Sequence, residues 1–137
     1  TDPADHLYLI EHQVWARVDD DGLVTQGITA LGVCLSGEVY MCRPKGVGLV
    51  LEQGKSMGVV ELAKSIVSVK SPLSGEVVAV NLRLREEPEL VHRDPYGAGW
   101  LLRLRPFDVD GERAALVTGE AIAPAMAAHA RLYRVKD

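Results

Sequence analysis

The chain has 137 residues and a formal net charge of −4, and 47% of its residues are hydrophobic and 25% charged. A chain of this length can bury a core without disulfide or metal support, so we expect residues 1–137 to form a single domain. No stretch is basic enough to neutralise several phosphates, and no apolar run approaches the roughly 20 residues that span a bilayer, which argues against nucleic-acid binding and against a membrane span.

The first third of the chain predicts short strands and one short helix. QVWARV (13–18) and LVTQGI (23–28) flank DDDG, whose Asp and Gly residues favour a hairpin turn. TALGVCLS (29–36) combines a threonine cap with apolar spacing suited to one or two helical turns. GEVYMCR (37–43) is strand-like and is expected to end at Pro44, because proline cannot extend a hydrogen-bonded ladder.

The remaining elements continue this pattern of short strands separated by turns. They are LVLEQG, MGVVE and IVSVK as strands, SPLSG as a turn, EVVAVN (76–81) as a strand, LREEPELVHRDPYGAG as a long loop with one helical turn, GWLLRLR (99–105) as a strand, and a C-terminal helical extension at about 119–134 whose start Pro124 limits. Strands at intervals of roughly eight to twelve residues predict a mostly β sandwich or barrel, with short helices and a C-terminal helix attached.

No catalytic or metal-binding arrangement is visible in the sequence. Gly54-Lys55-Ser56 lacks the glycine spacing and the following helix of a phosphate-binding loop. No Ser/His/Asp set can be assembled, and the histidines are scattered without metal-ligand spacing; they are His6, His12, His92 and His129. We therefore expect neither a metal site nor a self-contained enzyme.

The two cysteines and the N-terminal segment bear on the compartment. Cys34 and Cys42 lie eight residues apart without a CxxC pair, which favours reduced, buried thiols over redox chemistry. TDPADHLYLIEHQ has no charged region followed by an apolar one, as a secretory signal would have. Both features predict a cytoplasmic protein.

A lysine stands between two strand-forming runs in VELAKSIVSVK. MGVVE and IVSVK would pair as antiparallel strands if Leu62, Ala63, Lys64 and Ser65 reversed the chain between them. Lys64 would then project into solvent from a hairpin tip. Two explanations fit this position: a charge that protects a strand end from aggregation, or an amine that is acylated by a cofactor.

The segments VELAKSIVSVKSPLSGEVVAVN (60–81) and PELVHRDPYGAGWLLRL (88–104) resemble the H-protein family of the glycine cleavage system, and the resemblance spans about 8–105. It implies the hammerhead lipoyl fold, a barrel-sandwich hybrid of two antiparallel sheets. It also implies that Lys64 carries covalent lipoate as a swinging arm, and that Glu61 helps a lipoate ligase or lipoyltransferase to recognise the site.

The residues expected to contact the arm depart from the family pattern. The family usually has a glutamate directly after the histidine in H-E-W and often an aspartate four residues after the lysine. Here Gln13 follows His12, with one extra residue before Trp15, and the second position is Ser68. An aminomethyl cargo is a cation that calls for a carboxylate, so these departures favour another cargo.

Two pathways follow from this resemblance. The departures favour an H-like carrier of oxidative sulfur metabolism, which would serve a heterodisulfide-reductase-like complex. The alternative is the H protein of the glycine cleavage system, which shuttles aminomethyl between glycine decarboxylase, aminomethyltransferase and dihydrolipoamide dehydrogenase. An unmodified binding module, and an enzyme that turns over without partners, are the competing classes of function.

Overall fold

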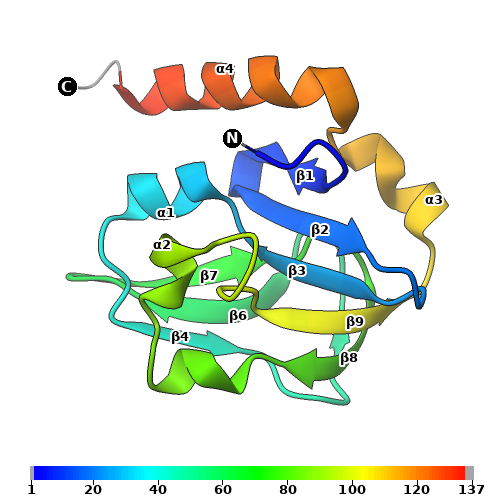
Figure 1. Ribbon diagram of the computed structural model, residues 1–137, viewed down its shortest axis with the longest axis horizontal. Coiled ribbons are helices and arrows are strands. Elements are labelled where there is room, and N and C mark those ends of the chain that lie inside the picture. Colours follow the sequence, from blue (N-terminus) through cyan, green and yellow to red (C-terminus); the bar gives the residue numbers. More distant parts are fainter. Residues whose placement is uncertain (1, 135–137) are drawn as a thin grey trace.

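The computed structural model describes residues 2–134, and its core is built from β-strands with helices around them (Figure 1). The strands in this part of the chain are β1 (Leu7–Leu9), β2 (Val14–Val18), β3 (Val24–Ile28), β4 (Met41–Pro44), β5 (Val50–Leu51), β6 (Ser56–Glu61), β7 (Ile66–Lys70), β8 (Gly75–Val80) and β9 (Leu102–Pro106). The helices are η1 (Ile10–His12), α1 (Ala30–Ser36), η2 (Leu82–Arg85), α2 (Leu90–Arg93), α3 (Val109–Glu112), η3 (Arg113–Ala115), η4 (Gly119–Ala121) and α4 (Ile122–Arg134).

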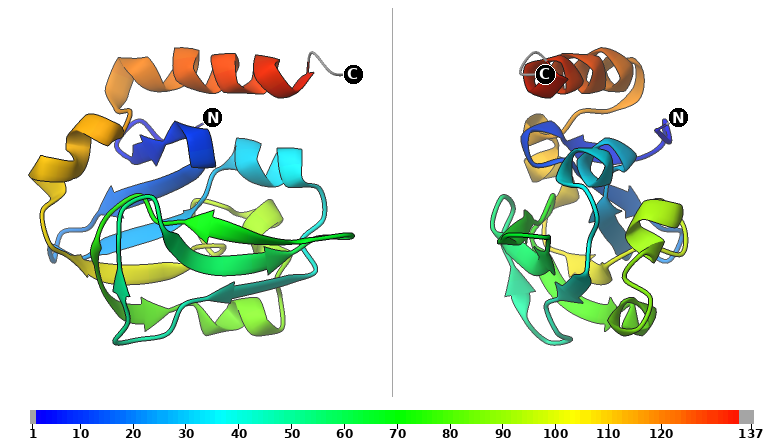
Figure 2. Two further views of the ribbon diagram at one scale, coloured as in Figure 1. Left: turned by 180° about the vertical axis from the view of Figure 1, so that it is seen from behind. Right: turned by 90° about the vertical axis from the view of Figure 1, so that its left-hand side faces the viewer.

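The strands form two antiparallel sheets with the core between them. The larger sheet has the order β1-β2-β3-β9-β8-β5, and the smaller has the order β4-β6-β7. Figure 2 shows the larger sheet curling around the smaller one, while α4 lies outside both, above β1 and α1. The fold predicted from the sequence, two antiparallel sheets with short helices and a C-terminal helix, is confirmed.

Local sequence signals predicted the hairpin and the helix of the first third correctly. Strands β2 and β3 pair from Val14 opposite Ile28 to Val18 opposite Val24. The hydroxyl of Thr29 accepts a hydrogen bond of 2.9 Å from the backbone N–H of Gly32 and so caps α1.

The structure corrects several details of the elements predicted from the sequence. Strand β4 begins at Met41 rather than at 37, because Gly37 ends α1 with a φ of 78° that breaks the extended backbone. Strand β5 is only two residues long, and the short strand β1 and the helices η2 and α3 were not predicted. The helix α2 is the one helical turn that was predicted in the long loop.

Strand β4 ends at Pro44, as the sequence predicted, and Pro44 is its last residue. The backbone N–H of Lys45 donates to the carbonyl of Met57 in β6 at 2.9 Å. Since hydrogen-bonding directions alternate along an antiparallel strand, the nitrogen of Pro44 faces away from β6. Strand β4 is at an edge of its sheet, so the missing N–H of this proline costs no ladder bond.

The loop DPYGAGW (94–100) connects the end of β8 in the larger sheet to α1 through hydrogen bonds. The side-chain amide of Asn81 donates to the carbonyls of Ala98 and Trp100, at 2.8 and 2.7 Å. The hydroxyl of Tyr96 accepts from the backbone N–H of Ala30 at 3.1 Å, which ties the loop to α1. The residues of this motif therefore have a structural role.

A buried histidine packs in an aromatic cluster next to this loop. The ring of His6 lies 5.0 Å from that of Trp15, and its Nδ1 is 2.9 Å from the carboxylate of Asp5. Its Nε2 is buried without a hydrogen-bond partner among residues 2–134. Burial lowers the pKa of His6 below its ordinary value, against the opposing effect of the Asp5 carboxylate.

This lowered pKa predicts a loss of stability at mildly acidic pH. Because the unfolded chain protonates His6 more readily than the folded chain, the stabilisation is fully present above about pH 6.5 and declines as the pH falls. Urea unfolding between pH 7.5 and 5.5 should show this decline, and His6→Gln should flatten it. An equally steep decline in His6→Gln would assign the effect to other groups.

Candidate functional site

Lys64 lies at the tip of a protruding hairpin. Strands β6 and β7 pair up to Glu61 opposite Ile66, and the backbone N–H of Leu62 donates to the carbonyl of Ser65 at 2.8 Å. This leaves Ala63 and Lys64 as the turn, and both are exposed. The hairpin extends beyond the rest of the molecule in the views of Figures 1 and 2. The antiparallel pairing predicted from the two apolar runs is confirmed.

A groove of about 370 Å³ begins beside this tip and runs between several elements. Its floor and walls come from β6 and β7, from α1, from η1 and from α4, and most of its lining is apolar. Leu62 belongs both to this groove and to the hollow around Lys64, so the two are continuous. A flexible chain attached at the tip would have a hydrophobic surface next to it.

The predicted arm contacts His12, Gln13 and Ser68 all line this groove. Ser68 lies on β7, where its hydroxyl accepts a hydrogen bond of 3.2 Å from the amine of Lys70. Glu61 lies apart from them, exposed at the end of β6 beside the tip. The structure thus brings three of these residues into one groove and leaves Glu61 next to the turn.

The side chain of Gln13 stabilises the start of α1 through hydrogen bonds within the protein. Its side-chain amide donates to the carbonyl of Ile10 at 2.8 Å, and its Oε1 accepts from the hydroxyl of Thr29 at 2.6 Å. Thr29 is the residue that caps α1, so Gln13 holds that cap in position. The side chain of Gln13 is buried and its hydrogen-bonding groups are already used.

The backbone conformation of Gln13 accommodates the extra residue before Trp15. Gln13 has a φ of 53°, and it is the only non-glycine residue among 2–134 with positive φ. This left-handed residue ends η1 and turns the chain into β2. As a result, Trp15 stays in the core while the preceding Glu11 and His12 face the groove.

The groove contains a carboxylate, that of Glu11, which the sequence did not predict. Glu11 lines the groove, its side chain is 75% exposed, and its Oε1 is 3.7 Å from Nε2 of His12. The sequence comparison missed it because Glu11 precedes the histidine, whereas the family glutamate follows it. Only the left-handed turn at Gln13 shows that a carboxylate reaches the groove.

The C-terminal helix supplies two further groove residues that the sequence did not predict. His129 and Tyr133 lie one turn apart on α4, with ring centroids 4.9 Å apart. Ile122 and Met126 anchor this helix by packing against Tyr8 and Trp15. The spacing of Ile122 and Met126 along the helix indicates that one face of α4 is packed. It does not indicate which residues that face packs against.

The cysteines and the remaining histidines do not extend the site. Cys42 is buried, and burial raises the pKa of its thiol to about 12, so it stays protonated at neutral pH. Cys34 is exposed, which corrects the prediction that both thiols are buried: it lies on the solvent side of α1. His92 accepts a hydrogen bond from the backbone of Val39 at 3.3 Å.

Two other kinds of site are absent from residues 2–134. No group of three or more His, Cys, Asp or Glu side chains in this range could hold a metal ion. None of the helices described is long and apolar enough to cross a membrane. In the GKS segment, Ser56 begins strand β6, so no helix follows to hold a phosphate.

Comparison with known proteins gives a consistent result. The family model "Glycine cleavage H-protein" matches residues 6–129. The glycine cleavage system H protein of Marinobacter nauticus is 40% identical over 126 residues, which cover 92% of this chain and 95% of that protein. H protein 2 of Aquifex aeolicus is 39% identical over 118 residues, which cover 86% of this chain and 73% of that protein.

A solved structure agrees with these sequence matches. The crystal structure of a glycine cleavage system H protein from Mycobacterium marinum superimposes with a TM-score of 0.71 at 33% sequence identity, covering 77% of this chain and 86% of that chain. Glycine cleavage H proteins are non-catalytic carriers with lipoate attached covalently to a lysine. On the family match, the identity to relatives and the shared fold, this chain belongs to the glycine cleavage H-protein family.

Proposed function

We propose that this chain is the lipoate carrier of a glycine cleavage system, with Lys64 as the attachment residue and the whole chain acting as one carrier domain. The observation that carries the proposal is the position of Lys64, exposed at a hairpin tip that opens onto an apolar groove. The amine is accessible to a lipoate ligase or lipoyltransferase, and Glu61 beside it is a candidate recognition residue.

The residues around Lys64 fit a long acyl group joined to its amine. Amide formation removes the lysine charge, and Leu62 and Val67 offer apolar surface for the resulting chain along the groove. Attached lipoate would supply a 1,2-dithiolane whose reduced form has two thiols for carrying a group or two electrons. The paired strands β6 and β7 hold the attachment point at a defined place, away from the body of the fold.

Tethering explains how such a chain serves several enzymes. A group held on a swinging arm stays at high local concentration near each docked partner, so it is not released into solution. The partners that follow from the proposed pathway are glycine decarboxylase, aminomethyltransferase and dihydrolipoamide dehydrogenase. The chain itself supplies a position, a docking surface and a groove, and catalysis stays with the partners.

Two observations favour aminomethyl over sulfur as the cargo. The relatives from Aquifex, Marinobacter and Mycobacterium are all named as glycine cleavage system H proteins, and none of these three names refers to sulfur oxidation. In addition, the groove contains the carboxylate of Glu11, with the imidazoles of His12 and His129 nearby. A cationic aminomethyl group at the end of the arm would have an acceptor there, so the departures at Gln13 and Ser68 no longer require another cargo.

Offering the lipoylated protein to two enzyme systems separately tests the pathway. We expect glycine decarboxylase to load the arm in the presence of glycine, and a heterodisulfide-reductase-like complex to give no transfer of sulfur to or from it. Mass spectrometry of the intact protein detects either cargo. Efficient sulfur transfer without aminomethyl loading would reverse this choice of pathway.

The role of Glu11 can be tested on the loaded protein. Glu11→Gln keeps the shape of the side chain but removes its charge, so we expect the aminomethyl group to be lost to solvent about two- to fivefold faster, the range of an exposed ion pair. Glu120→Gln, at an exposed glutamate on η4, is the matched control. Equal rates of loss in the two variants would exclude Glu11 as the acceptor.

A further inference from the structure

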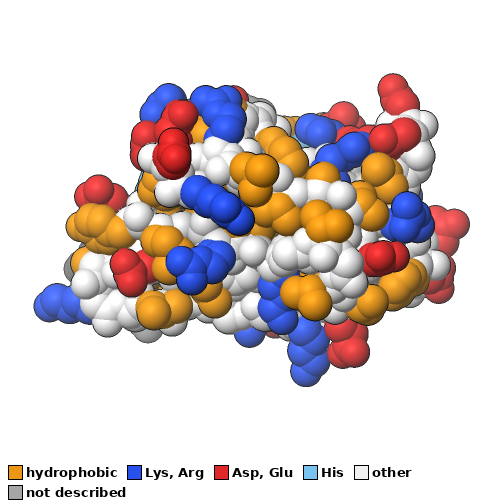
Figure 3. Space-filling view, turned by 90° about the horizontal axis from the view of Figure 1, so that it is seen from below, with side chains coloured by type: hydrophobic (Ala, Val, Ile, Leu, Met, Phe, Trp, Pro, Cys, Tyr) orange, Lys and Arg blue, Asp and Glu red, His pale blue; other side chains and the backbone are white. Residues whose placement is uncertain are grey.

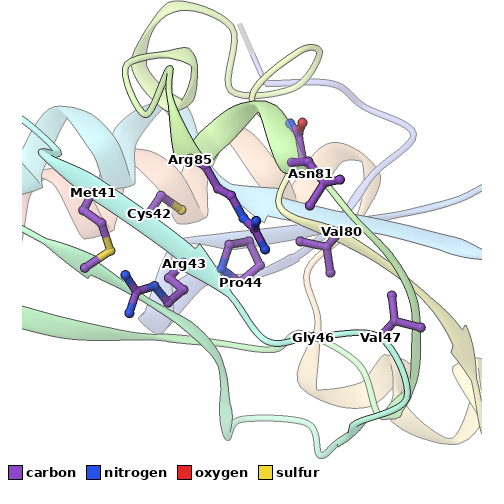
Figure 4. Close-up of a pocket in the computed structure, with 10 residues that line it drawn as sticks. Met41, Cys42, Arg43, Pro44, Gly46, Val47, Val80, Asn81 and Arg85 are labelled. Carbon is purple, nitrogen blue, oxygen red and sulfur yellow. The ribbon is translucent and has the colours of Figure 1, made fainter.

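A second cavity lies on the other side of the hairpin from the groove. It has a volume of about 660 Å³ and is lined by residues of the edge strand β4, of η2 and of the segments next to them. We call its outer lining the β4–η2 surface, which consists of Met41, Arg43, Val47, Val80, Leu82 and Arg85. In Figure 4, Arg85 extends from η2 toward Pro44, while the guanidinium of Arg43 lies nearer Met41 on β4.

The two arginines of this surface have no acidic partner in the structure. Within residues 2–134, neither Arg43 nor Arg85 has a carboxylate within ion-pair distance, and no Asp or Glu lines the cavity. Six other arginines do form ion pairs: Arg17, Arg83, Arg93, Arg103, Arg105 and Arg113. In a chain of net charge −4, this surface is therefore a local region of uncompensated positive charge.

Apolar side chains surround these two charges. Val47 and Leu82 are 66% and 63% exposed, and Met41 and Val80 are partly buried beside them. Figure 3 shows basic and hydrophobic side chains mixed across the middle of the lower face, with acidic side chains nearer its margins. Arginine within apolar surface is typical of protein–protein interfaces, where its guanidinium pairs with carboxylates.

The geometry also limits how a partner can bind. The side chains of Arg43 and Arg85 come from different elements and do not close around one point, which suits two separate carboxylates better than one small anion. Pro44 presents no N–H at the open edge of β4, which hinders the addition of a further strand. A partner would therefore contact this surface through side chains.

The β4–η2 surface is continuous with the hairpin tip. Met41 pairs with Glu61, the last residue of β6, and the backbone N–H of Tyr40 donates to the carbonyl of Glu61 at 2.8 Å. Tyr40 and Ile66 are exposed and line the hollow around Lys64. A protein that reaches over Lys64 along β4 would meet Arg43 next.

We propose that the β4–η2 surface docks an acidic surface of an enzyme that acts on the Lys64 arm, with carboxylates of that enzyme pairing with Arg43 and Arg85. This proposal rests on the function proposed for Lys64, since it takes the partner to be an enzyme that handles the arm. It places docking on the side of the hairpin opposite the groove, so a partner can bind while the arm still lies in the groove.

Charge reversal tests this docking. The lipoylated variant Arg43→Glu/Arg85→Glu is titrated calorimetrically against purified glycine decarboxylase, aminomethyltransferase and dihydrolipoamide dehydrogenase, and the unlipoylated variant against the lipoate ligase. We expect at least one dissociation constant to rise about tenfold or more, because like charges then face each other. We also expect the wild-type affinity for that enzyme to fall with added salt, and the affinity of the variant to fall less.

Arg113→Glu is the matched control, since Arg113 is an exposed arginine on η3 whose only ion pair in the described chain is with the exposed Asp110. It makes the same charge change as each single reversal and should leave every dissociation constant within about twofold of wild type. Arg43→Gln/Arg85→Gln, with an unchanged melting temperature, should give a smaller loss of the same affinity. Four affinities that all stay within twofold of wild type in the charge-reversal variant would overturn the proposal, as would a wild type that binds none of the enzymes. The intact mass at Lys64 reports separately on the proposed function.

Discussion

Lys64→Arg is expected to take up no lipoyl group and to lose all carrier activity. Arginine preserves the positive charge and the length of the side chain, but its guanidinium remains protonated and does not form the amide. The change lies in an exposed two-residue turn, so the stability of the fold should not change measurably. Intact-mass measurement after expression with lipoate and a lipoylating enzyme reports the modification directly.

Lys70→Arg provides the control on the same hairpin. Lys70 is at the end of β7 and donates to the hydroxyl of Ser68, so it is a nearby amine that is not in the turn. We expect this variant to gain one lipoyl group as the wild type does. A mass increase that persists in Lys64→Arg and disappears in Lys70→Arg would move the attachment to Lys70.

Trp15→Ala is expected to reduce the free energy of unfolding by about 3–5 kcal/mol, the usual cost of removing a large buried aromatic side chain. Trp15 is fully buried, and its indole N–H lies 3.1 Å from the carbonyl of Ile28 and 3.2 Å from that of Pro95. Gly27 lies against the indole, and a Cβ there would lie 2.8 Å from the ring. Urea unfolding measures the loss.

Trp15→Phe separates the indole hydrogen bonds from the packing. It keeps an aromatic ring but leaves the buried carbonyl of Ile28 and the partly buried carbonyl of Pro95 without this donor, so we expect an intermediate loss of about 1–3 kcal/mol. Trp100→Phe is the control, because the indole of Trp100 is only partly buried and donates no hydrogen bond within residues 2–134. Equal losses in the two phenylalanine variants would show that the hydrogen bonds of Trp15 contribute little.

The part of the site that depends on local sequence was predictable. Two β-branched runs separated by four residues specify antiparallel strands and a turn, and this arrangement by itself puts Lys64 in solvent. The threonine before α1 caps it by a contact three residues away. Such features need only neighbours in the sequence, so their patterns can be recognised without knowing the rest of the fold.

The groove could not be predicted in the same way, because its walls come from residues far apart in the chain. Glu11 reaches it only because Gln13 takes a left-handed conformation, which the side chain of Thr29 helps to hold. His129 reaches it because α4 crosses back over the N-terminal strand and packs on Tyr8 and Trp15. The family motif therefore indicated a missing carboxylate, whereas the folded chain places Glu11 in the groove.

By itself, the sequence pattern determined a fold of short strands, the hairpin and the exposed lysine at its tip, since strand patterns and turn residues act over a few positions. The two-sheet arrangement followed from the resemblance to the H-protein family. The tertiary structure alone decided which side chains surround that lysine. It brought Glu11 and α4 to one side of the hairpin and, among residues 2–134, left Arg43 and Arg85 without acidic partners on the other. The physical reason is that burial and charge pairing depend on distances between segments that only the folded core brings together.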